Sequence, residues 1–353
     1  MVDPVAIAAT LSEKVELSIE GTLYAGWQQV SVSRSLDSLS GNFELTLAAK
    51  ATTGGADLAI KTGDRCKLLV GGATVINGWV DAVSHTIGDN DHSLSVRGRD
   101  RTADLADCSA IHKPGSWKNV KIETIASELT APFGVSVTAK TSTGKAIPKF
   151  ALQQGETVQA AIERLLRFRG LLMVANEDGD LEIITPDSGA PAATLELGVN
   201  IKAITATFDA SQRFSEYLIK GQAAGDDHKN GKTVSQIKGN AGDAGVTRHR
   251  PLLIVAEEQG DGASLAVRAK FEAGVRAGKA VSAQISVAGW RVGAGGKLWA
   301  PNMAVRVKAA TVKLASEQML VTAVSFAKGD DGTTATLTVM PPGAWKQLAE
   351  GKA

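Results

Sequence analysis

The sequence predicts a β-rich α+β fold with two similar small β-barrel domains and an α/β insertion between them. Three observations support this prediction. Much of the chain alternates apolar and polar residues with a period of two, which is typical of strands with one buried face. Two amphipathic helical patterns interrupt this alternation near the middle of the chain. Finally, a segment near the end of the chain repeats one near its beginning, which favours duplication of a β unit.

The composition is that of a globular protein. The chain has 353 residues, of which 44% are hydrophobic and 21% are charged, and its formal net charge is +1. This near-neutral charge argues against specific or strong electrostatic binding of nucleic acid. Cys66 and Cys108 are too few for a disulfide framework. We expect no membrane anchor, because no apolar run approaches the roughly 20 residues of a membrane helix, and the N-terminus lacks a signal-peptide pattern.

The first β-barrel domain is expected over residues 1–104. Tight turns are expected at Gly71-Gly72 and at Asn77-Gly78, since both dipeptides can supply the positive φ of a hairpin turn. Strands are expected at 43–49, 66–70, 73–76, 79–87 and 92–99, with a further turn at 88–91.

The α/β insertion domain is expected over residues 105–190. Residues 120–129 and 155–170 carry apolar side chains at i, i+3, i+4 and i+7, which predicts two helices with one buried face each. Residues 171–185 are expected to form a hairpin that turns at Asp178-Gly179.

The second β-barrel domain is expected over residues 191–353. Its segment 221–250 is rich in Gly, Asp and Lys, which predicts an exposed loop. A helix is expected over 263–280, and strands resume at 281–290.

An internal repeat connects the two β-rich parts. Residues 79–89 (WVDAVSHTIGD) align with 320–330 (LVTAVSFAKGD) without a gap, and six of the eleven positions are identical. Two unrelated hairpins can also share apolar-polar alternation and a Gly-Asp turn, so the match could arise by chance. The gapless alignment and the shared strand order favour duplication. The supporting matches are 65–67 with 306–308, 93–96 with 336–339, and, shifted by one residue, 43–49 with 283–289.

No catalytic, metal or cofactor site is expected. The segment 225–233 has five residues between its glycines where a phosphate-binding loop needs four. None of the five histidines is spaced as a metal-ligand pair, and no Cys-x-x-Cys or Gly-x-Ser-x-Gly motif occurs. Cys108 and His112 lie close in sequence, but a single cysteine near a single histidine is a weak sign of nucleophilic chemistry.

A charged cluster, RGRDRTADLAD at 97–107, has three interpretations. Its aspartates could bind a hard cation, it could be a solvated turn, or its arginines could pair with carboxylates at a contact with another subunit or domain. Asp100 is expected to cap a short helix. The residues predicted at a subunit interface are Arg97, Arg99, Asp100, Arg101, Asp104 and Asp107, with Trp290 and Trp299 as core or interface anchors.

The chain resembles a known family over most of its length. The resemblance is carried by GRDRTADLADCSA (98–110), GWQQVSVSRSLDSLSGNFELTL (26–47), INGWVDAV (76–83), GETVQAAIERLLRFRGLLM (155–173) and GWRVGAGGKLWAPNMAVRV (289–307). These segments resemble the baseplate hub proteins of Mu-like contractile-tailed phages, the Mu-type tail protein P family. No single segment is diagnostic, but their order and spacing together are specific.

The resemblance implies a structural protein of the tail baseplate, in a phage or a prophage-derived particle. Members form a homotrimeric ring whose six barrels join a sixfold tail tube to a threefold central spike. The implied partners are other copies of the chain, a central spike protein, a tail tube or tube-initiator protein and other baseplate proteins. The implied location is the virion tail, after assembly in the host cytoplasm, and the family has no catalytic residues or cofactors to carry over.

Two other classes of function stay open. A tail-associated cell-wall hydrolase would need acidic residues in a cleft, and no convincing set occurs. A carbohydrate-binding module could stack sugars on tryptophans such as Trp290 and Trp299.

Overall fold

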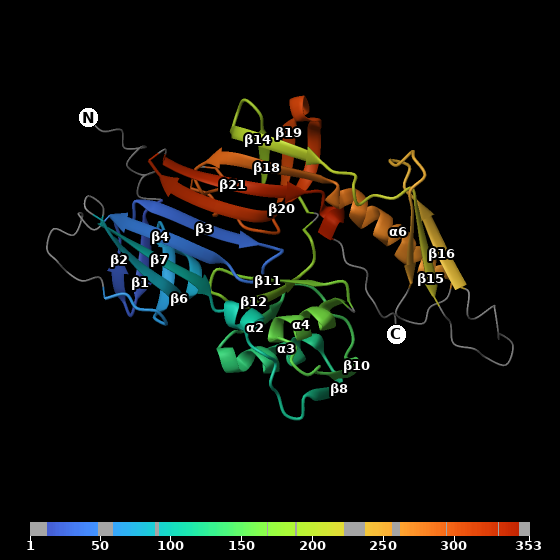
Figure 1. Ribbon diagram of the computed structural model, residues 1–353, viewed down its shortest axis with the longest axis horizontal. Coiled ribbons are helices and arrows are strands. Elements are labelled where there is room, and N and C mark those ends of the chain that lie inside the picture. The colour runs from blue at the N-terminus through green and yellow to red at the C-terminus, as the bar shows by residue number, and fades with distance from the viewer. Residues whose placement is uncertain are drawn as a thin grey trace.

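The computed structural model describes residues 13–48, 59–88, 92–167, 169–187, 189–221, 237–255, 262–293, 295–330 and 332–345. The fold is β-rich, as predicted, with helices in two smaller units (Figure 1). One large sheet contains thirteen strands. An α/β unit lies against one side of this sheet, and a second small unit lies beyond one end of it (Figure 1).

The first β unit contains seven antiparallel strands in the order β3-β4-β7-β6-β5-β1-β2. The turn at Gly71-Gly72 is confirmed, with φ of +55° and +78°. Its strands are β1 (Val15–Ile19), β2 (Thr22–Tyr24), β3 (Gln29–Ser35), β4 (Asn42–Ala48), β5 (Arg65–Val70), β6 (Ala73–Ile87) and β7 (His92–Asp100).

The predicted turn at Asn77-Gly78 is wrong, because β6 runs straight through both residues. A Cβ atom at Gly78 would lie 1.9 Å from the carbonyl oxygen of Arg99 on β7. The glycine therefore permits a close approach of two strands and does not form a turn. The Asn77 side chain donates a 2.8 Å hydrogen bond to the carbonyl of Asp178 in the α/β unit.

The α/β unit has its own core, built by the two predicted helices. Ile122, Ile125 and Leu129 of α3 are buried with Ile162 and Leu165 of α4, as the helical spacing predicted. Its elements are α2 (Ala103–Asp107), β8 (Ser116–Val120), α3 (Ile122–Thr130), η2 (Ala131–Phe133), β9 (Val137–Ala139), β10 (Ile147–Ala151), α4 (Val158–Arg167), β11 (Leu172–Ala175) and β12 (Leu181–Ile184). The hairpin of β11 and β12 turns at Gly179, as predicted.

The second β unit contains six strands in the order β14-β18-β21-β20-β19-β13. Strand β20 also pairs with β3, which joins the two β units into one continuous sheet. The described strands do not close into a barrel, so the two-barrel form of the prediction is not confirmed. The strands are β13 (Ala193–Glu196), β14 (Ile201–Phe208), β18 (Val281–Ala288), β19 (Ala304–Ala309), β20 (Leu314–Gly329) and β21 (Gly332–Met340), with η3 (Ala310–Val312) and η4 (Pro342–Trp345) between and after them.

The small side unit interrupts the second β unit between β14 and β18. It consists of β15 (Glu216–Gly221), β16 (Ile237–Gly242), β17 (Pro251–Val255) and α6 (Gly262–Lys279). The prediction of an exposed loop over 221–250 is therefore wrong for 237–242, which forms a strand, while 222–236 lies outside the described residues. A Cβ at Gly239 would lie 2.2 Å from α6, so this glycine permits close packing of the helix.

The two β units share strand order and irregularities, as expected of a duplication. Strands β5-β6-β7-β4-β3 of the first unit correspond to β19-β20-β21-β18-β14 of the second. The β6–β7 pairing has a bulge between Val80 and Ala82, and the β20–β21 pairing has one between Val321 and Ala323, positions that the sequence repeat aligns. Such bulges are conserved features of related sheets. One difference is that β1 pairs with β5 antiparallel, whereas β13 pairs with β19 parallel.

The registers correct two of the supporting sequence matches. Arg99 lies opposite Trp79 and Met340 lies opposite Leu320, so the offset of 79–89 to 320–330 also holds for β7 and β21. The match of 93–96 with 336–339 is therefore displaced by two residues. The match of 65–67 with 306–308 is displaced likewise, because Arg65 pairs with Trp79 and Ala304 pairs with Leu320. The one-residue shift of 43–49 to 283–289 is correct.

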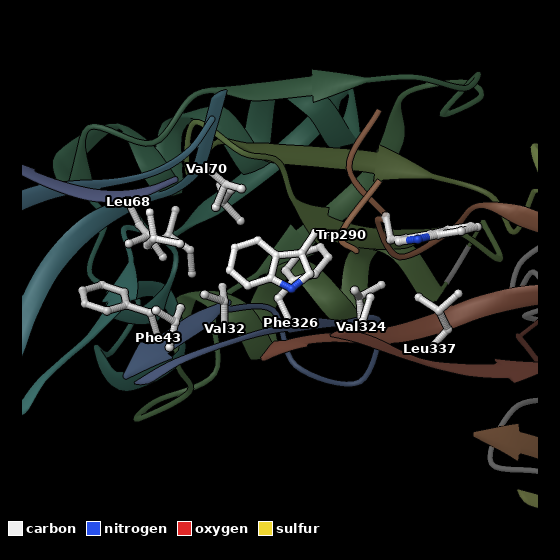
Figure 2. Packing of buried hydrophobic residues seen from close by; sticks show 14 of the residues in the cluster. Val32, Phe43, Leu68, Val70, Trp290, Val324, Phe326 and Leu337 are labelled. Carbon is white, nitrogen blue, oxygen red and sulfur yellow. The ribbon is translucent and has the colours of Figure 1, made fainter. Parts of the chain in front are cut away.

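One hydrophobic core runs beneath both β units. Leu68 and Val70 face Val32 and Phe43 across this core, and Trp290 lies between the two layers (Figure 2). The ring of Trp290 packs 5.5 Å from that of Phe326, measured between centroids. The core faces of the strands are thereby covered, and their other faces are left open.

Candidate assembly site

The charged cluster at 97–107 lies where β7 ends and the α/β unit begins. Arg97, Arg99 and Asp100 belong to β7, and α2 carries Asp104 and Asp107. The sequence prediction of a strand followed by a short helix is confirmed. The side chains of the cluster point to different neighbours, so each is described in turn.

Asp100 is buried and connects β7 to the loop before β4. Its carboxylate accepts hydrogen bonds from the backbone N–H of Gly41 (2.6 Å), the backbone N–H of Thr102 (2.9 Å) and the Thr102 hydroxyl (2.5 Å). Burial raises the pKa of Asp100, and these three donors act in the opposite direction. The prediction that Asp100 caps the helix is wrong, because Thr102 holds the N-cap position and Asp100 lies two residues earlier.

Arg101 connects the first β unit to the α/β unit. Its guanidinium donates to the carbonyl of Gly134 (2.7 Å), to the carbonyl of Asp178 (2.8 Å) and to the carboxylate of Asp180 (2.8 Å). The side chain is 13% exposed. Two of these hydrogen bonds reach the turn of the β11–β12 hairpin and fix its orientation, and the third holds the end of η2.

The same joint includes residues that the sequence analysis missed. Arg34 of β3 is buried and donates to the carboxylate of Glu177 (2.9 Å) and to the carbonyl of Ala175 (2.7 Å). Burial acts to raise the pKa of Glu177, but the charge and hydrogen bond of Arg34 outweigh it and hold that pKa below its usual value. Arg34 and Glu177 are 143 positions apart, so no local pattern could have paired them.

Arg99 lies at the surface and bridges two aspartates. Its guanidinium is 2.7 Å from Asp81 and 2.9 Å from Asp107. These hydrogen bonds, that to Asp81 above all, raise the pKa of Arg99. Burial raises the pKa of Asp104, which lines a polar surface depression together with Asp81, Arg99 and Trp79. Arg97 is exposed on the open face of the sheet.

Trp290 and Trp299 lie inside the subunit. Both belong to the shared core. The Trp290 indole N–H donates to the carbonyls of Ala327 (3.2 Å) and Thr334 (2.9 Å). These contacts explain the burial of Trp290 without another subunit, and an interface role for either tryptophan stays a prediction.

The described residues show few groupings of side chains suited to metal binding or catalysis. Within the described ranges, no three or more His, Cys, Asp or Glu side chains are grouped so that they could hold a metal ion. His112 stacks on Trp117 and lies 3.5 Å from Glu128. Helices in the described parts of the chain are too short or too polar to cross a lipid bilayer. The best-developed polar sites are thus the joints between units, which suit a structural role.

Three family models match successive parts of the chain. Residues 14–100 match the Mu phage baseplate assembly protein GpP-like N-terminal model. Residues 102–185 match the baseplate hub protein gp44-like second domain, and residues 262–347 match the Mu phage baseplate assembly protein GpP fourth domain. The first boundary falls at the strand-to-helix transition after Asp100.

Known proteins resemble the chain over nearly all of its length. It is 34% identical to baseplate hub protein gp44 of Escherichia phage Mu, over 94% of this chain and 88% of that protein. The crystal structure of the 43 kDa tail protein of prophage MuSo2 from Shewanella oneidensis matches with a TM-score of 0.86 and 34% identity, over 95% of this chain and 100% of that one. A tail protein from Neisseria meningitidis MC58 shares the fold, with a TM-score of 0.80 and 24% identity, over 95% of this chain and 98% of that one.

The fold and its polar joints are those of a structural tail protein. The chain belongs to the family of Mu-type baseplate hub proteins. The family is named for a structural role and not for an enzymatic activity.

Proposed function

We propose that the chain forms a threefold baseplate hub ring that joins a sixfold tail tube to a threefold central spike in a contractile tail. Family membership supports the hub role. The observation that carries the ring is the duplication: each chain holds two β units with the same strand order and the same bulge. Three chains therefore present six similar β units, which matches both symmetries.

The proposal extends to the finer organisation of the chain. The two β units are the two barrel domains of the sequence prediction, and the α/β unit is the insertion between them. The partners are further copies of this chain, a central spike protein, a tail tube or tube-initiator protein and other baseplate proteins. The protein assembles in the host cytoplasm and resides in the virion tail. The charged cluster, and in particular Arg99 and Asp104, lies at a boundary between subunits.

The mass of the protein in solution tests the ring. Sedimentation equilibrium of the full chain is expected to give three times the 36.6 kDa of one chain. A second measurement, negative-stain electron microscopy, should show particles with threefold symmetry. A monodisperse monomer at micromolar concentration would contradict the ring and would favour a binding module.

A further inference from the structure

We propose that the open face of the small sheet in the side unit binds a helix of another baseplate protein, and that this helix carries an apolar stripe with acidic residues at one end. The small sheet consists of β16, β15 and β17, in that order. The inference rests on the proposed hub function, and it adds the surface through which a further protein of the baseplate meets the hub.

The small sheet is covered by a helix on one face only. Tyr217 and Ile219 of β15 are fully buried against α6, in a core with Leu265 and Ala269. Helix α6 also packs against η4, so it lies between the large sheet and the small one (Figure 1). The opposite face of the small sheet therefore points away from the rest of the chain, and its described side chains are exposed or half-buried.

This open face has an apolar centre. Leu218 of β15 lies opposite Leu253 of β17, and Val255 follows Leu253 on the same face. Leu253 is 51% exposed and Val255 is 69% exposed. The three side chains are neighbours on adjoining strands, so they form one continuous apolar surface, which is typical of an interaction site.

The sequence of β17 is that of a strand buried on both faces. Residues 252–255 are four consecutive apolar residues, and β17 pairs parallel with β15. Strands in parallel pairs are usually covered on both faces, and continuous apolar runs are typical of them. Leu252 and Ile254 pack against the α6 core, which accounts for one face. The exposed Leu253 and Val255 indicate a second cover, which the described residues do not supply.

The large sheet shows what this chain places on a face that stays open. Strand β21 buries Leu337 and Val339 in the core and carries Thr336 and Thr338 on its other face. Threonine suits such a position, because it favours strands and its hydroxyl can bond to water. Strand β17 has leucine and valine at the corresponding alternate positions. The small sheet is thus built to be covered, whereas the large sheet is built to meet water.

The dimensions of the small sheet favour a single helix as the cover. Neighbouring strands lie about 4.8 Å apart, so three strands form a surface about 10 Å across. One helix with its side chains has about this diameter. Helix α6 covers the other face of the same sheet in this way, so a second helix would complete a three-layer unit of helix, sheet and helix.

The charges of the open face select an acidic partner. Lys220 of β15 lies directly opposite Lys238 of β16, and both side chains are exposed. Like charges at opposed positions of neighbouring strands are destabilising. A carboxylate of the partner helix beside the two lysines would offset this repulsion. A second copy of the face would bring one carboxylate, Glu216, to two lysines, so an acidic helix is the better complement.

Cysteine labelling of the free and the assembled protein tests the surface. The background is Cys108→Ser, since Cys108 is exposed, while Cys66 is buried and burial raises its pKa to about 12. In this background, Val255→Cys should react with a maleimide in the free protein and at least about tenfold more slowly in purified tails, because the reaction requires access to the thiol. The matched variant Val267→Cys places the thiol at a 56% exposed position of α6 and should react equally fast in both.

Carbodiimide cross-linking of purified tails tests the chemistry of the partner. The reagent joins a lysine amine to a carboxylate without a spacer, so it links only groups that are in contact. Peptides linked at Lys220 or Lys238 should contain an aspartate or glutamate of another baseplate protein, identified by mass spectrometry. Links only to a second copy of the face, links only to carboxylates of the same chain, or the absence of links would overturn the acidic partner.

A substitution separates this surface from the ring. Leu253→Asp should keep the trimer in sedimentation, change the melting temperature no more than Val267→Asp does, and lower the yield of complete tails at least about tenfold, the loss expected when a charge replaces a central apolar contact. Val267→Asp is the control and should keep the yield. If Leu253→Asp assembles as well as this control, or if Val255→Cys stays reactive in tails, the surface is wrong while the hub stands. If the unaltered protein is a monomer that is absent from tails, both proposals fall.

Discussion

Removal of the Arg101 side chain should loosen the joint between the first β unit and the α/β unit. Arg101→Ala deletes hydrogen bonds to the carbonyls of Gly134 and Asp178 and to the carboxylate of Asp180. A hydrogen bond to a charged group contributes about 1.5–3 kcal/mol, and loss of one partner from a buried pair costs about 3–5 kcal/mol. Asp180 stays 24% exposed and keeps the N–H of Ser136 as a donor, so water and this donor compensate in part. We therefore expect a loss of about 2–4 kcal/mol in the free energy of unfolding.

Urea denaturation monitored by circular dichroism measures this loss. A double-mutant cycle with Asp180→Asn isolates the Arg101–Asp180 contact, for which we expect a coupling energy of about 1–2 kcal/mol. Arg97→Ala is the control, because Arg97 is exposed on the open face of the sheet, and it should change the stability by less than about 0.5 kcal/mol. If Arg101→Ala costs no more than Arg97→Ala, the guanidinium is solvated and the joint does not depend on it.

Three further predictions use the same denaturation assay. Asp100→Asn should lower the free energy of unfolding by about 1–3 kcal/mol. The two carboxylate oxygens accept hydrogen bonds from Gly41 and Thr102, whereas an amide has only one accepting oxygen. Equal stability would show that Asp100 is protonated or solvated. Gly78→Ala should lower the free energy of unfolding by at least about 2 kcal/mol, since its Cβ would meet the Arg99 carbonyl. The control is Gly274→Ala on α6, where a Cβ meets open space, and it should be neutral or stabilising by up to about 1 kcal/mol. Arg34 lowers the pKa of Glu177, so the Arg34–Glu177 ion pair should make the free energy of unfolding depend on pH. Its contribution to stability is at most about 1 kcal/mol for a half-exposed pair; it should be present above the unfolded-state pKa near 4.3 and be lost as the pH falls below it. Glu177→Gln should show no such loss.

Periodic patterns predicted the elements that bury one face in a core. Helices α3 and α4 were predicted because their buried side chains recur at helical spacing, and packing of these faces is what stabilises them. The duplication was predicted because the aligned segment keeps its length, and the structure places a bulge at the same point of both copies. The sequence match aligned Arg65 with Arg306 incorrectly, because two strands with alternating apolar residues match equally well when one is shifted by two residues.

Glycines misled the sequence analysis where they serve packing. Gly78 and Gly239 were assigned to a turn and a loop, yet both lie in strands where another backbone approaches too closely for a Cβ. A single sequence does not distinguish these two uses of glycine. The joint of Arg34 and Glu177 was missed for a different reason: it connects residues far apart in sequence, and only the fold brings them together.

The bulge shared by the two β units relates the charged cluster to the proposed ring. In the second unit the bulged residue is Thr322, which is buried and whose carbonyl accepts the N–H of Leu36. In the first unit the same position is Asp81, which is exposed and paired with Arg99. The position that connects the two β units within one chain is therefore exposed in the first unit, where Asp81 lies beside Arg99 and the depression lined by Asp104. The strongest contacts of the cluster, those of Asp100 and Arg101, hold one chain together, whereas Arg99 and Asp104 would lie at the boundary between two chains.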